Sequence, residues 1–201
     1  MKSGLYISNE TARLTAMIEV FISHASQDAR LAEALVVFLR DALSLQRSEI
    51  RCTSVDGCRL PAGANTENQL RCEIVDATYF LALITPTTLK SPWVLIELGA
   101  RWAVERPLMP LLAKGATAKN LQGPLVSFNA LRCDKEPEMQ QLVHEMAETL
   151  GRAAPQPSVY RRTLNQLIAQ GKPVSSVAPS NLNPALINSL LKLGEPGNTS
   201  L

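Results

Sequence analysis

The chain is organised around the stretch SPWVLIELGARWA, residues 91–103. Ser91 is a favourable N-cap residue, and Pro92 suits the first helical position because the N–H that proline lacks would have no partner there. The stretch therefore predicts a helix that begins at Pro92. Trp93 and Glu97 lie four residues apart, so they project from the same side of this helix, one turn apart. In a parallel sheet, such a helix begins at the edge where ligands bind.

Glu97 has two interpretations when the helix is considered alone. It could be a solvent-exposed carboxylate that pairs with Arg101 one turn later, a contact worth roughly 0.2 to 0.5 kcal/mol. It could instead be a functional carboxylate, held near the positive end of the helix dipole beside an aromatic ring. The second arrangement suits a reaction in which positive charge builds on a sugar ring while an aromatic leaving group departs. The helix by itself leaves both interpretations open.

The composition is that of an ordinary globular protein. The 201 residues include 20 Lys and Arg against 18 Asp and Glu, so the net charge of +2 predicts no strong attraction to nucleic acid. The four cysteines lack CxxC spacing and have only two histidines as co-ligands, so we expect no metal site and reduced thiols in a cytoplasm. These cysteines are Cys52, Cys58, Cys72 and Cys133. The N-terminus does not resemble a signal peptide, and the longest apolar run, residues 79–84, is too short to cross a membrane. We therefore expect a soluble cytoplasmic protein with no nucleic-acid or membrane partner.

Short apolar stretches alternate with amphipathic ones along the chain. The predicted strands are residues 19–23, 49–53, 79–84, 108–113 and 130–132. A first helix is predicted to begin near Ser26. Further helices are predicted over residues 66–76, 92–106 and 136–150. The strand at residues 79–84 is apolar throughout, which is typical of a strand covered on both faces. This alternation predicts an α/β fold with a parallel sheet and helices on both faces.

The expected domain organisation has three parts, namely an N-terminal extension at residues 1–17, a main domain at residues 18–151 and a helical C-terminal extension at residues 152–201. In the extension, helices are predicted over residues 158–170 and 183–193. The second of these helices has an apolar side with no assigned partner, formed by Leu186, Ile187, Leu190 and Leu191. Either the two helices pack on their own domain, or they contact a second subunit or another protein.

Three blocks of sequence resemble the bacterial branch of the Toll/interleukin-1 receptor (TIR) domain family, over roughly residues 18–150. They are VFISHASQD at residues 20–28, the loop at residues 56–63, and SPWVLIEL at residues 91–98. The first is similar to the family's box 1, the second to its BB loop, and the third to the Trp-x-x-x-Glu of members that cleave NAD+. The resemblance implies a flavodoxin-like fold with a sheet of five parallel strands.

For the site, the resemblance implies that Glu97 is the catalytic carboxylate and engages the ribose next to nicotinamide. Trp93 would flank the same pocket, which would also be lined by the end of the first strand at Ser23, His24 and Ala25. The BB loop would contribute Asp56, Arg59, Leu60 and Gly63. Two features depart from the family pattern. His24 and Ala25 stand where some NAD+-cleaving relatives carry an aromatic and a basic residue, and one alanine separates the proline and glycine of the BB loop.

We therefore expect an NAD+ glycohydrolase or ADP-ribosyl cyclase, with NAD+ as its substrate and no separate cofactor. The resemblance further implies self-association through TIR contacts, a role in anti-phage immunity through NAD+ depletion or a nucleotide signal, and a defence effector or sensor protein as a partner. Two alternatives stay open. One is a non-catalytic TIR adaptor that uses the loop at residues 56–63 for protein contact. The other is an enzyme like the nucleoside deoxyribosyltransferases, which share this type of sheet and also use a glutamate at a ribose.

Overall fold

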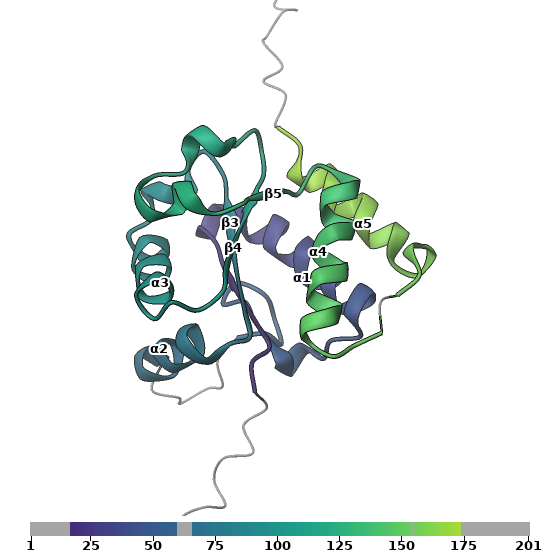
Figure 1. The fold of residues 1–201 in the computed structure, drawn as a ribbon, viewed down its shortest axis with the longest axis horizontal. Helices are drawn as coiled ribbons and strands as arrows, with labels where there is room; N and C mark the ends of the chain where they lie inside the picture. The colour runs from purple at the N-terminus through teal and green to yellow at the C-terminus, as the bar shows by residue number, and fades with distance from the viewer. Residues whose placement is uncertain (1–16, 60–65, 154, 174–201) are drawn as a thin grey trace, which may run out of the picture.

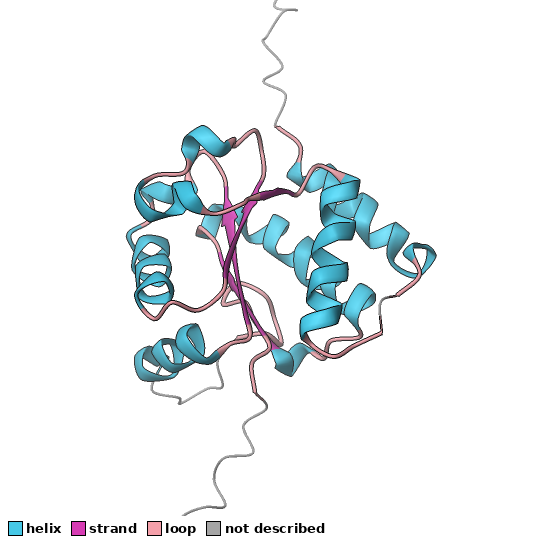
Figure 2. Ribbon diagram, viewed as in Figure 1, coloured by secondary structure: helices cyan, strands magenta, loops and turns pink. Residues whose placement is uncertain are grey.

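A five-stranded parallel sheet forms the centre of the molecule. The structure is a computed structural model that describes residues 17–59, 66–153 and 155–173. The sheet has the order β2-β1-β3-β4-β5, and every neighbouring pair is parallel (Figure 2). The strands are β1 (Val20–Ser23), β2 (Ile50–Arg51), β3 (Tyr79–Ile84), β4 (Leu108–Leu112) and β5 (Leu131–Arg132). This is the flavodoxin-like strand order, so the predicted fold class is confirmed.

Helices cover both faces of the sheet, as predicted (Figure 1). One face carries α1 (Ala29–Leu43), α4 (Glu136–Thr149) and α5 (Pro157–Gly171). The other face carries α2 (Thr66–Asp76) and α3 (Pro92–Ala103). The connections contain short 3-10 helices, namely η1 (Ser26–Asp28), η2 (Arg47–Glu49), η3 (Thr88–Lys90), η4 (Ala118–Asn120) and η5 (Gly123–Ser127).

The central strand β3 is buried along its whole length. Leu81 and Leu83 belong to the core beneath α1, α4 and α5, whereas Phe80 belongs to the core beneath α2 and α3. On this second side Phe80 stacks on Phe21 of β1, with ring centroids 5.2 Å apart. Because successive side chains of a strand point to opposite faces, a strand without polar alternation needs a cover on each side.

Two elements are shorter than the sequence predicts by more than one residue. The strand expected at residues 49–53 ends at Arg51, because the N–H of Cys52 donates to the carbonyl of Cys58 (3.1 Å) and closes a local loop instead of extending the ladder. The helix expected to reach Arg106 ends at Ala103, and Glu105 adopts a left-handed backbone with φ 54°. A residue with positive φ cannot continue a right-handed helix.

The first helix of the predicted C-terminal extension, α5, packs on the same core as α1. Tyr160, Leu164 and Leu167 are buried there, and the Tyr160 ring meets the edge of Phe38 at a centroid distance of 5.6 Å. The predicted helix at residues 183–193 lies outside the described residues, so its partner and the proposed domain boundaries stay predictions.

Candidate active site between α2 and α3

Glu97 lies beside the carboxyl end of β1. The Ser23 hydroxyl, at the last position of that strand, donates a hydrogen bond to Oε2 of Glu97 at 2.5 Å. Glu97 reaches this position because α3 begins at Pro92, directly after η3, with Ser91 as its N-cap residue. The Ser91 side chain makes no capping hydrogen bond, so proline at the first helical position and the backbone set the start of the helix.

Trp93 and Glu97 line one pocket of about 380 Å3 between α2 and α3. The remaining lining residues are Glu67, Leu70, Arg71, Ile74 and Ile96. This volume lies near the lower end of the range for small-molecule sites, so the pocket suits one ring and its sugar better than a whole dinucleotide. The Trp93 side chain is 72% exposed and forms an open wall of the pocket. A carboxylate and an indole therefore face a shared space, one helical turn apart.

Burial raises the pKa of Glu97 above its usual value, and the hydrogen bond from Ser23 opposes that rise. A carboxylate in such a place has lost part of its hydration shell and interacts more strongly with a nearby positive charge than it would in water. The site therefore combines a desolvated carboxylate with one hydroxyl that favours its ionised form.

Arg101 does not pair with Glu97. The interpretation of Glu97 as a solvent-exposed carboxylate paired with Arg101 is therefore wrong. The Arg101 side chain is fully buried and points toward the C-terminal end of α2. Its guanidinium donates to five backbone carbonyls, those of Ile74, Val75, Ala77, Thr78 and Pro107. Helices end with unsatisfied carbonyl groups, which a buried guanidinium can satisfy. Arg101 thus joins the two helices that form the walls of the pocket.

The two residues after Ser23 face other surroundings. Nε2 of His24 lies 2.6 Å from the hydroxyl oxygen of Ser54, and Cys52 Sγ lies 4.0 Å from its Nδ1. Burial lowers the pKa of His24, so the ring is neutral at neutral pH. Ala25 lines a separate hollow of about 450 Å3 at the carboxyl ends of β1 and β3, together with Ser26, Gln27, Thr87, Lys90 and Ser91. Of the three predicted residues at the end of β1, Ser23 is the one for which the described structure shows a hydrogen bond to Glu97.

The TIR domain family matches residues 20–145, which is more than half of the chain. The chain belongs to the TIR domain family. None of the curated protein sequences compared with it matches. A solved structure described as "Structure of the activated Roq1 resistosome directly recognizing the pathogen effector XopQ (TIR domains)" matches with 13% identity and a TM-score of 0.38, over 88% of this chain and 99% of that one. At this level the likeness says nothing about the function of the chain.

The first part of the predicted BB loop folds into a compact turn. Asp56 and Arg59 form an exposed ion pair at 3.3 Å, and Arg47 donates to the carbonyl of Asp56 at 2.5 Å. Gly57 between them has φ 79°, which favours glycine. Both charged side chains point outward at this turn, and neither lines the pocket of Glu97. The other two predicted loop residues, Leu60 and Gly63, lie outside the described residues.

Sequence reasoning missed a buried polar network at the carboxyl ends of the strands in this TIR domain. Asp28, after β1, accepts hydrogen bonds from Lys114 Nζ at 2.7 Å and from the Thr85 hydroxyl at 2.9 Å. Thr85 in turn lies 2.8 Å from the hydroxyl of Thr88 in η3. This network ties the segment after β1 to the segment that starts α3, and so holds Ser23 near Glu97. In the sequence, the one sign of this network is Asp28 itself, an acidic residue close to the start of the helix that is predicted to begin near Ser26.

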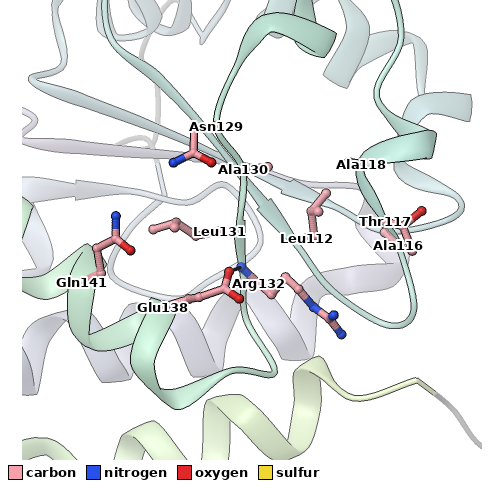
Figure 3. Close-up of a pocket in the computed structure, with 10 residues that line it drawn as sticks. All are labelled: Leu112, Ala116, Thr117, Ala118, Asn129, Ala130, Leu131, Arg132, Glu138 and Gln141. Carbon is pink, nitrogen blue, oxygen red and sulfur yellow. Dashed lines mark hydrogen bonds between the residues drawn. The ribbon is translucent and has the colours of Figure 1, made fainter.

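A further pocket of about 430 Å3 lies beside β4 and the edge strand β5 (Figure 3). Its two charged side chains already have partners within the domain. Glu138 accepts a hydrogen bond from the backbone N–H of Arg132 at 2.6 Å, and the guanidinium of Arg132 points away from Glu138 and pairs with Asp134 at 3.0 Å. None of the predicted site residues lines this pocket. Among the residues that the structure describes, no cluster of His, Cys, Asp or Glu could hold a metal ion, and no helix is long and apolar enough to span a membrane.

Proposed function

We propose that this TIR domain cleaves the bond between nicotinamide and ribose in NAD+. The products would be nicotinamide and either ADP-ribose or a cyclic isomer of ADP-ribose. The observation that supports the proposal most directly is the desolvated Glu97, which accepts a hydrogen bond from Ser23 and shares a pocket with Trp93. Membership of the TIR family, which includes NAD+-cleaving members that resemble this chain in Trp93 and Glu97, supports the same reaction.

In this reaction the bond from the ribose C1′ to the pyridinium nitrogen breaks, and its electron pair leaves with nicotinamide. Positive charge then builds on C1′ and on the ring oxygen of the ribose. An ionised Glu97 stabilises that charge, and it does so more strongly than in water because the pocket is partly desolvated. A water molecule or a nitrogen of the adenine ring then attacks C1′. Loss of one proton from the attacking water gives ADP-ribose, whereas attack by the adenine nitrogen gives the cyclic product.

Trp93 and Ser23 would both assist the reaction, Trp93 by binding the substrate and Ser23 by acting on Glu97. The flat face of the Trp93 indole attracts the pyridinium cation of NAD+ and holds it over the pocket. The Ser23 hydroxyl orients Glu97 and keeps it ionised, which the reaction requires.

We further propose that self-association completes the site, because the pocket is open and the resemblance to the TIR family implies self-association through TIR contacts. The resemblance to bacterial TIR proteins supports a cytoplasmic role in anti-phage immunity, in which NAD+ depletion or a nucleotide signal follows assembly with a defence effector or sensor protein. Activity should then rise steeply with protein concentration.

The decisive experiment is to incubate the concentrated full chain with NAD+ and to measure free nicotinamide, with chromatography of the products. Glu97→Gln should lower the rate by about 100-fold or more, since it removes one electrostatic stabiliser of the transition state. Glu105→Gln is the matched control, because Glu105 is exposed beyond the end of α3 and lies outside the pocket. Equal rates for the native chain and Glu97→Gln would refute the assignment of Glu97.

A non-catalytic adaptor is the second candidate function. It is favoured by one observation, the large apolar surface that α3 exposes to solvent. The native chain would then release no nicotinamide at any concentration, and the same assay separates the two functions.

A further inference from the structure

The outward side of α3 is apolar along its whole length. Its exposed large side chains are Trp93 (72%), Leu95 (49%), Ile96 (60%) and Trp102 (52%), with Val104 (40%) directly after the helix. Gly99, Ala100 and Ala103 are exposed between them. Of the two charged residues of the helix, Glu97 is half-buried on the pocket side, beside Trp93, where it accepts a hydrogen bond from Ser23, and Arg101 is fully buried. No charged side chain therefore projects from the outward side of α3.

The other helices of the domain expose polar side chains instead. The exposed residues of α1 include Arg30, Glu33 and Asp41, those of α4 include Glu136, His144 and Glu148, and those of α5 include Arg161, Arg162 and Asn165. Contiguous apolar surface of this kind on a soluble domain marks a contact site for protein or ligand. Among the described helices, α3 is the one whose outward side has this character.

Gly99 lies at the middle of this apolar side. A helix is less stable with glycine than with alanine in its interior, so a glycine there usually has a packing reason. The domain itself provides none, because a Cβ at Gly99 would have no neighbouring atom within 4 Å. A close approach from outside the described structure would explain the absence of a side chain.

We propose that residues 183–193 of the same chain dock on the outward side of α3. These residues lie outside the described structure, and their sequence predicts a helix whose apolar side is formed by Leu186, Ile187, Leu190 and Leu191. The two lengths agree, since 11 helical residues span about 16 Å and the 12 residues of α3 span about 18 Å. Two helices with matching apolar sides would remove each other's exposed surface from water.

The chain leaves the described domain at the carboxyl edge of the sheet. The carbonyl of Gly171, the last residue of α5, accepts a hydrogen bond from the N–H of Lys114 at 2.6 Å. Lys114 follows β4, so this contact lies at the carboxyl edge of the sheet, which is the edge where α3 begins. From Pro173, the residues 174–182 can span up to about 30 Å.

A segment of the same chain fits this surface better than a second copy of the domain. The two exposed indoles offer roughly 200 to 300 Å2 together, and the three exposed aliphatic side chains are smaller. A stable interface buries about 800 Å2 on each partner, so this surface alone is too small for a stable dimer. A segment tethered by a short linker is present at an effective concentration on the order of millimolar, which makes a small contact sufficient.

The fluorescence of tryptophan tests this proposal directly, because the chain has two tryptophans and both lie on the outward side of α3. The full chain is compared with Leu190→Asp and with the control Asn188→Asp, which adds the same charge on the polar side of the predicted helix. Docking predicts that Leu190→Asp shifts the emission to longer wavelength. It should also raise the acrylamide quenching constant by about twofold, since half or more of each indole becomes exposed. Asn188→Asp should leave both measurements unchanged.

A second variant, Gly99→Gln, changes the surface of α3 instead of the segment at residues 183–193. Gly99 is exposed and a Cβ there would meet no neighbouring atom, so the variant should fold normally by circular dichroism and yet show the same increase in quenching as Leu190→Asp. Unchanged quenching in Leu190→Asp, measured at a dilution at which the protein is monomeric, would overturn the proposal. Protection of the indoles that depends on protein concentration and not on Leu190 would also overturn it, in favour of a second copy.

Docking would bring residues 183–193 next to the candidate active site, because Trp93 and Ile96 also line the pocket of Glu97. Under the proposed function, which this consequence assumes, Leu190→Asp should change the rate of nicotinamide release whereas Asn188→Asp should not. The quenching measurement needs no turnover, so failure of the docking and failure of the proposed activity are distinguishable.

Discussion

Replacement of Arg101 by lysine tests how the two walls of the candidate pocket are joined. The native guanidinium donates to five carbonyls, at 2.9 Å to Ile74, 2.9 Å to Val75, 2.8 Å to Ala77, 3.3 Å to Thr78 and 3.0 Å to Pro107. Burial lowers the pKa of Arg101 to about 10, so the side chain stays charged at neutral pH. Lysine keeps the charge but has three donors on one nitrogen, so at least two carbonyls lose their partner. With about 1 to 3 kcal/mol for each unsatisfied buried group, Arg101→Lys should cost about 2 to 6 kcal/mol.

The measurement is equilibrium unfolding in urea, followed by circular dichroism, with the free energy of unfolding extrapolated to water. Arg106→Lys is the control, because Arg106 is exposed two residues before β4 and should change the free energy by less than about 0.5 kcal/mol. Since Arg101 holds α3 to the end of α2, a folded Arg101→Lys protein should also release nicotinamide more slowly than the native chain.

A cost below about 1 kcal/mol for Arg101→Lys would refute this reasoning. It would indicate instead an exposed pair with Glu97, whose loss costs only roughly 0.2 to 0.5 kcal/mol. Combination with Glu97→Gln separates the two cases, because contacts that share no partner have additive effects.

Three further predictions concern the site and the network beneath it. Ser23→Ala removes the hydrogen bond to Glu97 and should raise the pKa of that carboxyl further. The acid limb of the pH profile for nicotinamide release should then move to higher pH. An unchanged profile would contradict a role for the hydroxyl. Because burial raises the folded-state pKa of Glu97, the ionised carboxylate destabilises the fold at neutral pH and this penalty disappears as the pH falls below the usual glutamate range. Glu97→Gln should therefore melt at higher temperature than the native chain at pH 7, with a smaller difference at pH 4, and a lower melting temperature at pH 7 would argue against a desolvated carboxylate. Asp28→Asn leaves the ammonium of Lys114 with a neutral acceptor and should cost about 1 to 3 kcal/mol in the same urea assay, whereas no change would show that the buried network contributes little.

Periodicity and local chemistry were enough to predict the architecture. Residues 79–84 have no polar alternation, and a strand of that kind must be covered twice, which already requires helices on both faces. Pro92 and its preceding serine predicted the start of α3 because the conformational limits of proline act within one residue. The errors occurred at element ends, such as Arg51 and Ala103, where contacts of the following loop decide how far the regular backbone continues.

The candidate site depended more on tertiary structure. Helical spacing correctly placed Trp93 and Glu97 on one side of α3, since that relation is local. The same spacing suggested an ion pair of Glu97 with Arg101, which the structure contradicts, because spacing says which side chains can meet and not which partners the rest of the fold offers them. Ser23 reaches Glu97 across 74 positions of sequence only because β1 lies next to β3, and that neighbourhood is a property of the folded sheet. Local patterns therefore determined the elements and the chemistry that they carry, whereas the packing of distant strands decided which of those groups come into contact.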